Sequence, residues 1–467
     1  RTVGTVEFAV GETARAAVDA AAAAFPAWDR TPAAERATSL ARAADLFEAN
    51  APELLGLCIR EAGKNLPDSV AELREAVDFL RYYGARAVAD FGSARLLPGP
   101  TGERNELSRH GRGVFFCVSP WNFPLAIFTG QVAAALAAGN SVVAKPAEQT
   151  SLVAARAVEL MHEAGVPGGA LNFVPGLGPD VGRHVLPDPR VAGVAFTGST
   201  ETAQIINRQL AERAGPIAAL IAETGGQNAM LVDSSALPEQ VVLDAAQSAF
   251  NSAGQRCSAL RVLFLQEEIA DKTLGLLKGY MDQLVIGDPA LLRTDVGPVI
   301  DQDALDILEA HAAKITEKGR LIHRCTLGPE TEHGTFFAPM AVEIDGLGQL
   351  EREVFGPIMH VVRYRAKDLE KIIDEINATG YGLTLGVHSR IDSRAEEIAR
   401  RVTVGNVYVN RNIIGAVVGV QPFGGRGLSG TGPKAGGPDY LHRYGTERTV
   451  TVNTSAVGGN ASLLTLD

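Results

Sequence analysis

Cys257 is the residue whose surroundings in the sequence point most directly to covalent chemistry. It lies in a polar, glycine-containing stretch, NSAGQRCS at residues 251–258, which precedes an apolar run. A nucleophilic thiol needs access and nearby hydrogen-bond donors. A structural cysteine normally sits within an apolar run, as Cys117 does at residues 115–118. We therefore expect Cys257 to act as a nucleophile.

Glu223 is the candidate general base. It ends the apolar run 218–222 and is followed by Thr224-Gly225-Gly226. Desolvation at that point would raise the pKa of the carboxyl group towards that of a useful base. A lone glutamate at a strand end is more often solvated or capping, and the residues alone leave both interpretations open.

Two glycine-containing turns could hold a phosphate. Gly176, Gly178 and Gly182 join a predicted strand to a predicted helix, but their spacing is GxGxxxG, whereas a dinucleotide loop has GxGxxG. Tight helix packing explains these glycines equally well. The sequence TGST at 197–200 makes a similar junction, where N–H groups and hydroxyls could bind a phosphate or merely cap a helix.

Lys145 and Glu148 follow the predicted strand 141–144. A lysine donor and a glutamate acceptor together suit the hydroxyls of a ribose, and the glutamate would repel a 2′-phosphate. Charged residues after a strand are also common on plain protein surfaces, so this pair by itself is a hypothesis.

The elements between these residues decide whether they meet. Apolar runs expected to be strands alternate with helix-like stretches, which indicates a parallel sheet that binds ligands beyond the carboxyl ends of its strands. The expected strands are 114–118, 141–144, 171–174 and 191–196, and the expected helices are 125–138, 151–164 and 180–186. A second series of runs, at 229–232, 261–265, 358–364 and 406–409, predicts a second α/β domain.

Other parts of the chain carry different patterns. Residues 12–89 are rich in alanine with apolar residues three and four apart, which predicts several amphipathic helices. Residues 96–112 contain PGPTG and mixed charge, which favours an exposed hairpin or arm. From Thr446 the chain alternates like a strand without a core of its own, so it should pair with another element or subunit.

The composition of the 467 residues excludes several classes of function. The formal charge is 43 − 54 = −11, and no basic stretch offers a footprint for nucleic acid. Apolar residues make up 46% and charged residues 21%, as in a globular protein of two or three domains. The longest apolar runs are far too short to span a membrane. Four isolated cysteines without a zinc motif lead us to expect no metal and a cytoplasmic location.

Two further observations restrict the hypotheses. The chain starts at Arg1 without a charged-then-apolar leader, so we expect it to be processed, truncated or cut from a longer polypeptide. It contains no GxSxG elbow, no HExxH motif and no P-loop. Serine hydrolase, zinc protease and P-loop hypotheses therefore lose support.

Seven short motifs, in this order, resemble those of the aldehyde dehydrogenases over essentially the whole chain. They are PWNFP (120–124), KPAE (145–148), FTGST (196–200), ETGG (223–226), GQRC (254–257), EVFGP (353–357) and PFGG (422–425). The resemblance implies the α/β aldehyde dehydrogenase fold, NAD as cofactor and a homodimer or larger oligomer. The implied parts are a Rossmann-like NAD-binding domain (1–93 and 113–224), an α/β catalytic domain (225–424) and a small β oligomerisation arm (94–112 and 446–467).

The resemblance also implies roles for single residues. Cys257 would be the nucleophile, Glu223 the base for hydrolysis, and Asn122 a donor to the oxyanion. Contacts to NAD would come from Lys145, Glu148, Gly178, Gly182, Thr197, Gly198, Ser199, Glu353 and Phe355.

Within the family, the loop GAVVGVQPFGG (415–425) and the ending GGNASLL (458–464) resemble the L-glutamate γ-semialdehyde dehydrogenases, most closely the dehydrogenase half of the bifunctional proline utilisation A proteins. This likeness implies a substrate site at Ser258, Gly415, Ala416 and Phe423, and a possible fusion or pairing with a proline dehydrogenase. Ala416 stands where some members have serine, so one hydroxyl is lost. Oxidation of another carboxylated aldehyde, such as succinate semialdehyde, and an inactive scaffold remain the alternatives.

Overall fold

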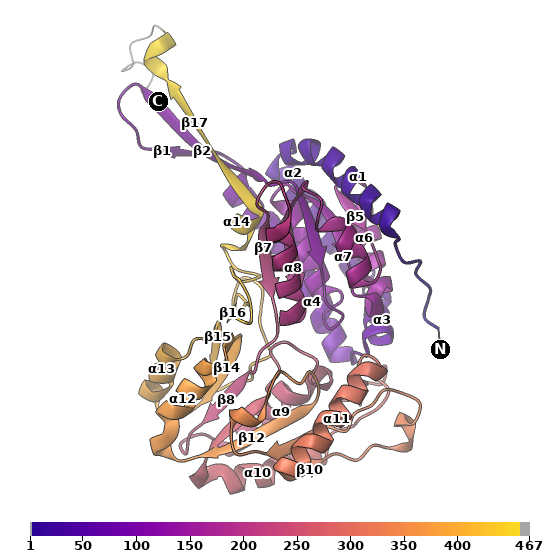
Figure 1. The fold of residues 1–467 in the computed structure, drawn as a ribbon, viewed down its shortest axis with the longest axis vertical. Helices are drawn as coiled ribbons and strands as arrows, with labels where there is room; N and C mark the ends of the chain where they lie inside the picture. The colour runs from indigo at the N-terminus through magenta and orange to yellow at the C-terminus, as the bar shows by residue number, and fades with distance from the viewer. Residues whose placement is uncertain (1, 458–467) are drawn as a thin grey trace.

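The computed structural model describes residues 2–457, and its amino-terminal quarter is helical (Figure 1). The alanine-rich residues predicted to be helical pack against one another through small side chains, and α2, α4 and the later helix α5 are neighbours. Asn65 caps α4, since its side chain accepts a hydrogen bond from the N–H of Asp68. The four helices are α1 (Gly11–Arg30), α2 (Ala33–Ala49), α3 (Ala51–Ala62) and α4 (Leu66–Phe91).

The first sheet has five parallel strands in the order β5-β4-β3-β6-β7. They are β3 (Val114–Val118), β4 (Ser141–Lys145), β5 (Leu171–Phe173), β6 (Val191–Thr197) and β7 (Ala219–Glu223). Its helices are α5 (Ala126–Ala137), α6 (Ser151–Glu163), α7 (Gly178–Val185) and α8 (Thr200–Glu212). The predicted strands and helices are confirmed to within two residues at their ends. The strand order reverses beside β3, which is where ligands bind in such sheets.

The second sheet has seven strands in the order β10-β11-β12-β9-β8-β14-β15, of which β10 alone runs antiparallel. They are β8 (Ala229–Val232), β9 (Val262–Gln266), β10 (Arg320–Arg324), β11 (Met340–Glu343), β12 (Ile358–Tyr364), β14 (Thr384–His388) and β15 (Asn406–Val409). The helices of this part are α9 (Pro238–Phe250), α10 (Glu267–Met281), α11 (Gln302–Lys318), α12 (Leu369–Ala378) and α13 (Asp392–Arg401). The sequence predicted β8, β9, β12 and β15, and it missed β10, β11 and β14.

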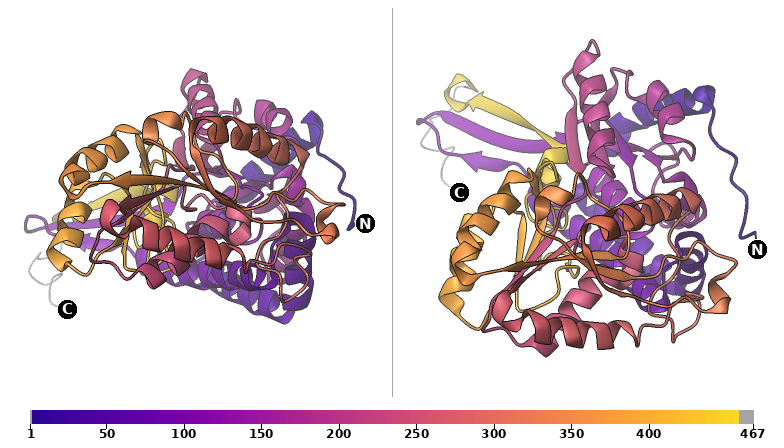
Figure 2. Two further views of the ribbon diagram at one scale, coloured as in Figure 1. Left: turned by 90° about the horizontal axis from the view of Figure 1, so that it is seen from below. Right: turned by 60° about the horizontal axis from the view of Figure 1, so that its bottom comes forward.

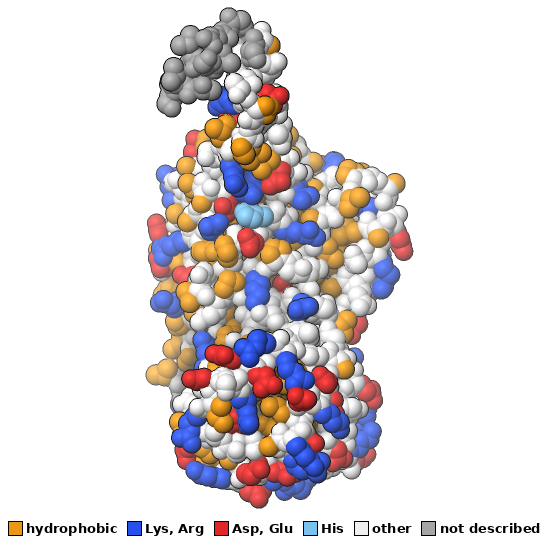
Figure 3. Space-filling view, turned by 90° about the vertical axis from the view of Figure 1, so that its left-hand side faces the viewer, with side chains coloured by type: hydrophobic (Ala, Val, Ile, Leu, Met, Phe, Trp, Pro, Cys, Tyr) orange, Lys and Arg blue, Asp and Glu red, His pale blue; other side chains and the backbone are white. Residues whose placement is uncertain are grey.

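A thin three-stranded sheet projects from this body in every view (Figures 1 and 2). It consists of β1 (Arg95–Leu97), β2 (Glu103–Gly111) and β17 (Gly445–Asn453), in the order β1-β2-β17. The tail strand therefore pairs with the predicted arm along its whole length. Figure 3 shows hydrophobic side chains along this arm. Its role in assembly and the three domain boundaries stay predictions, and residues 458–467 of the predicted tail lie outside the described residues.

Short elements complete the fold: β13 (Tyr381–Gly382), β16 (Arg426–Gly427), α14 (Tyr440–Tyr444) and the 3₁₀ helix η2 (Asn251–Gly254). None of the helices within residues 2–457 is long and apolar enough to cross a membrane. The same residues contain no cluster of three or more His, Cys, Asp or Glu side chains that could hold a metal ion.

Candidate active site

The two sheets meet at the candidate site. Strand β7 ends at Glu223 and β8 begins at Ala229, so the carboxyl edge of the first sheet faces the amino edge of the second. A pocket of about 340 Å³ lies at this junction, open to solvent on one side. Its lining includes seven residues predicted for the site: Thr197, Glu223, Cys257, Ser258, Gly415, Ala416 and Phe423.

Cys257 is presented by a turn with an unusual backbone. Ser252 and Ala253 in η2 both have left-handed φ angles, 53° and 52°, which are uncommon for residues with a Cβ atom. The Arg256 guanidinium contacts the Asp68 carboxylate of α4 at 2.6 Å, with both side chains buried. Burial raises the pKa of the Cys257 thiol to about 12, and the Glu353 and Glu223 carboxylates add to the rise. The thiol is therefore protonated in this state of the protein.

Asn122 lies beside this turn, outside the residues that line the pocket. Its amide nitrogen donates a hydrogen bond to the Gln255 carbonyl, two residues before Cys257, at 3.1 Å. A side-chain amide carries two N–H donors, so one remains available to a ligand. Helix α5 begins just after Asn122, and Glu72 of α4 accepts the N–H of Ala126 at 2.7 Å. The structure thus brings the predicted oxyanion donor next to the predicted nucleophile.

Glu223 is buried at the end of β7. Its Oε2 accepts the N–H of Gly425 at 3.0 Å, whereas its Oε1 has no hydrogen-bond partner among the described residues. Burial raises the pKa of Glu223 to about 8, although the Gly425 N–H and the nearby Lys434 ammonium oppose the rise. Near neutral pH, such a carboxyl group can both hold and release a proton.

Lys145 and Glu148 meet just beyond β4. The Lys145 ammonium donates to the Pro146 carbonyl at 2.7 Å and contacts Glu148 at 3.4 Å. Burial lowers the pKa of Lys145, and the Glu148 carboxylate partly restores it. The pair offers a donor and an acceptor side by side, which is the arrangement that the sequence analysis expected for a ribose.

The predicted phosphate turns open two helices. Gly178 is the first residue of α7 and Gly182 is buried one turn later, whereas Ser199 caps α8 by accepting the N–H of Thr202 at 3.1 Å. The Thr197 hydroxyl accepts a hydrogen bond from Gln131 at 3.0 Å. Gly198, between Thr197 and Ser199, donates to the Glu223 carbonyl at 3.2 Å. Capping and anion binding are compatible, because further N–H groups of the helix terminus stay unpaired.

Glu353 and Phe355 lie just before β12 and are held by Arg261. The fully buried Arg261 guanidinium contacts Glu353 at 2.9 Å and lies over the Phe355 ring, 5.1 Å from its centroid. A Cβ atom on Gly225 would overlap the Glu353 carboxylate, so the glycine leaves the space that Glu353 occupies. Both predicted residues therefore lie at the junction of the two sheets, beside Gly225.

Helix α4 contributes pocket residues that the sequence analysis missed. Arg74, Glu75 and Asp78 line the pocket, and burial raises the pKa of Glu75 to about 7, with the Glu72 carboxylate adding to the rise. A signal was present in the sequence: Asp68, Glu72 and Glu75 are spaced four and three residues apart, which puts three acids on one face of a helix. A row of acidic residues along one face of an amphipathic helix indicates that this face contacts polar or charged groups.

Sequence comparison agrees with this geometry. A model of the aldehyde dehydrogenase family matches residues 1–450. The chain belongs to the aldehyde dehydrogenase family. It is 53% identical over 454 residues to the bifunctional protein PutA of Klebsiella aerogenes, covering 96% of this chain and 34% of that protein. It is 38% identical to the 1-pyrroline-5-carboxylate dehydrogenase of Geobacillus kaustophilus strain HTA426, and the aligned region covers 96% of this chain and 87% of that protein. This aldehyde dehydrogenase chain thus spans about a third of the length of the PutA relatives.

Solved structures of the family superimpose closely on the chain. A crystal structure of bifunctional proline utilization A has a TM-score of 0.96 and 57% identity, and it covers 98% of this chain and 46% of that one. A 1-pyrroline-5-carboxylate dehydrogenase from Thermus with bound NAD has a TM-score of 0.91 and 35% identity. The superposition covers 97% of this chain and 87% of that one. The expected aldehyde dehydrogenase fold is therefore confirmed.

Proposed function

We propose that this aldehyde dehydrogenase oxidises L-glutamate γ-semialdehyde, formed from pyrroline-5-carboxylate, to L-glutamate in proline catabolism, with NAD as the oxidant. The observation that carries the proposal is one pocket shared by the Cys257 thiol, the Glu223 carboxyl group and the Gly415 loop. Relatives named 1-pyrroline-5-carboxylate dehydrogenase and PutA support the substrate.

The residues beside the pocket fit NAD. Lys145 and Glu148 supply a donor and an acceptor for a ribose diol, and the start of α8 at Ser199 offers N–H groups to a pyrophosphate. At the other end, the Glu353 carboxylate, which fills the space that a Cβ atom on Gly225 would take, offers an acceptor to the second ribose. When bound, NAD supplies the acceptor for the hydride. Glu148 favours NAD over NADP, since its charge repels a 2′-phosphate.

The protein's own residues account for the other steps. The Cys257 thiol loses its proton to solvent as the sulfur adds to the aldehyde carbon, and the Asn122 amide stabilises the oxyanion of the hemithioacetal, a contribution of about 3 kcal/mol for one donor. After oxidation, a thioester remains on Cys257. Glu223 takes a proton from water, which attacks the thioester carbonyl, and returns the proton to the departing sulfur, so that the carboxylic acid and the thiol are released.

The far end of the pocket suits the amino-acid part of the substrate. Ser258 and the backbone amides of Gly415 and Ala416 would receive the α-carboxylate, and the Phe423 ring would pack on the aliphatic stem. Turn N–H groups bind anions without an arginine in direct contact. The Ala416 side chain supplies no hydroxyl, so we expect weaker binding of the carboxylate than in members with serine at this position. We expect the reaction itself to be the same.

Replacement of the nucleophile tests the proposal. We expect Cys257→Ala to abolish NADH formation from the semialdehyde, because no other thiol lines the pocket among the described residues. NAD binding, measured by fluorescence titration, should persist. Cys325→Ala, which removes a thiol remote from the pocket, is the matched control and should keep its turnover. Turnover in Cys257→Ala would refute the assignment.

Kinetics with two aldehydes separate the alternatives. A much higher kcat/KM for succinate semialdehyde than for L-glutamate γ-semialdehyde would refute the proposed substrate. Absence of NAD reduction with either aldehyde, by folded protein, would favour an inactive scaffold. Assembly through the arm, pairing with a proline dehydrogenase and a cytoplasmic location are further parts of the proposal, supported by the arm's shape and the likeness to PutA.

A further inference from the structure

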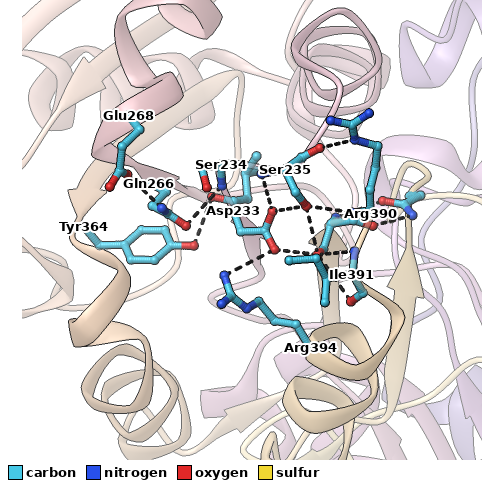
Figure 4. A network of polar contacts seen from close by, with 12 residues as sticks. Asp233, Ser234, Ser235, Gln266, Glu268, Tyr364, Arg390, Ile391 and Arg394 are labelled. Atoms are coloured by element: carbon cyan, nitrogen blue, oxygen red, sulfur yellow. Dashed lines mark hydrogen bonds and ion pairs between the residues drawn. The ribbon is translucent and has the colours of Figure 1, made fainter.

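The loop that follows β15 is anchored at its start by a network at the carboxyl ends of β8 and β14. Asn410 has a left-handed φ of 54°, and its amide oxygen accepts the Ser389 N–H at 3.0 Å while its nitrogen donates to the Ser389 carbonyl at 2.9 Å. The Ser389 hydroxyl in turn donates to Asp233 at 2.5 Å. Figure 4 shows Asp233 at the centre of this network, with Ser235 and Arg394 directed at its carboxylate.

Further along, helix α9 and the loop itself hold the backbone. The Ile413 N–H donates to the Ser248 hydroxyl at 3.1 Å, and the Val417 N–H donates to the Gln421 side chain at 3.1 Å. Between these two points lie Gly415 and Ala416, which line the pocket. In the described part of the chain, the N–H groups of these two residues make no hydrogen bond. The unpaired N–H groups of Gly415 and Ala416 thus lie between two backbone positions that hydrogen bonds hold in place.

Arg411, which is not among the residues that line the pocket, holds the middle of the loop. Its guanidinium donates to the Gly415 carbonyl at 2.9 Å and, less closely, to the Asn412 carbonyl at 3.3 Å. It lies over the Tyr408 ring of β15, 5.1 Å from the centroid. A Cβ atom on Gly415 would lie 2.8 Å from the Arg411 guanidinium, so a larger residue at 415 would displace the guanidinium.

We propose that Arg411 is a positioning residue that gives this aldehyde dehydrogenase its selectivity for a carboxylated substrate. In a trans peptide the C=O and the N–H point in opposite directions. The bond from Arg411 to the Gly415 carbonyl therefore turns the Ala416 N–H away from Arg411, towards the pocket that Ala416 lines. The guanidinium charge also polarises this peptide and makes its N–H a stronger donor. The inference rests on the proposed function, in which this loop receives the substrate carboxylate.

Arg411→Met removes the bond and keeps much of the side-chain volume. With saturating NAD, we expect kcat/KM for L-glutamate γ-semialdehyde to fall roughly ten- to a hundred-fold, mainly through KM. Propanal has no carboxylate, so its kcat/KM should change less than about two-fold. The inhibition constant of L-glutamate should rise in step with KM. Arg411→Lys, which keeps the charge without the planar fork, should give intermediate values, and Arg400→Met on exposed α13 is the matched control.

The outcomes distinguish the inference from the proposed function. Equal losses with both aldehydes would show a merely structural role for Arg411, and wild-type kcat/KM values with both would show no role, so either result overturns the inference alone. A wild-type enzyme without preference for the semialdehyde over propanal would overturn the proposed function and the inference with it. If Arg411→Met does not fold, the L-glutamate inhibition constant of Arg411→Lys decides, because it should still exceed the wild-type value.

Discussion

At the scale of single residues, Glu223 links the buried pocket to a measurable pH dependence. Its raised pKa of about 8 means that the carboxyl group is mostly protonated at neutral pH and cannot then accept a proton from water. We expect hydrolysis of the thioester to accelerate as the pH rises and to level off above the pKa of Glu223. Glu223→Gln should hydrolyse the thioester slowly, without this rise.

Single-turnover and burst experiments between about pH 6 and about pH 9 can separate formation of the thioester from its hydrolysis. In the wild type, the steady-state rate should approach the burst rate as the pH increases. The same pH profile in Glu223→Gln would show that another group activates the water.

The sequence could identify a functional residue where the neighbouring residues along the chain are unusually polar or apolar. It could not identify residues whose role depends on contacts made by folding. Cys257 differs from Cys117 because a polar stretch surrounds it, and the structure places Cys257 in the pocket and Cys117 in the core of β3. For Glu75 the spacing of acids on α4 indicated a polar helix face, but not that this face packs against the pocket. Arg411 is also undetectable alone, since its partner is a backbone carbonyl four residues away.

At the scale of elements, one face of α4 connects the two loops that carry the catalytic candidates. Asp68 binds Arg256, beside Cys257, whereas Glu72 binds Lys64 at 3.1 Å and also caps α5. Both cations lie over the Phe123 ring, the Lys64 ammonium at 4.2 Å and the Arg256 guanidinium at 5.3 Å from its centroid. The spacing of Asn122 and Cys257 therefore depends on a helix that contributes neither residue.

Glu72→Gln tests how much this connection stabilises the protein. The substitution removes the carboxylate that pairs directly with the buried Lys64 ammonium, so we expect the free energy of unfolding to fall by about 3 kcal/mol. Denaturant unfolding measures it. Glu48→Gln is the control, because Glu48 pairs with Arg81 on the surface and should change stability by about 0.5 kcal/mol or less. Similar changes in the free energy of unfolding of both variants would show that the buried Lys64–Glu72 pair stabilises the protein no more than a surface pair does.

Two of the strands that the sequence analysis missed, β10 and β14, have apolar runs that are interrupted. The runs that became β3 and β12 are apolar and nearly all buried. Strand β10, at the edge of its sheet, has a mixed pattern with two arginines, and β14 is interrupted by a glycine. The left-handed residues of η2 were also unpredictable, because serine and alanine carry no preference for that conformation.

At the scale of the whole molecule, one face of the arm exposes three apolar side chains beside the charged Arg104 and Glu106. The register of the arm pairs Leu96 with Glu106 and Glu106 with Val450, which puts these residues on one face. Val452, two positions along the strand, shares that face. Leu96, Val450 and Val452 are 67%, 45% and 48% exposed. We expect a second copy of the chain to cover this face.

Val450→Asp tests that expectation by placing a charge among these apolar side chains. A symmetric dimer contains the contact twice, so the loss of about 1.5 kcal/mol per valine weakens association roughly 100-fold. Light scattering after size exclusion should give a multiple of 49.1 kDa for the wild type and a mass nearer 49.1 kDa for the variant. Thr449→Asp, on the opposite face of the same strand, is the control and should keep the wild-type mass. A wild-type monomer at micromolar concentration, or equal effects of the two substitutions, would contradict the assignment of this face.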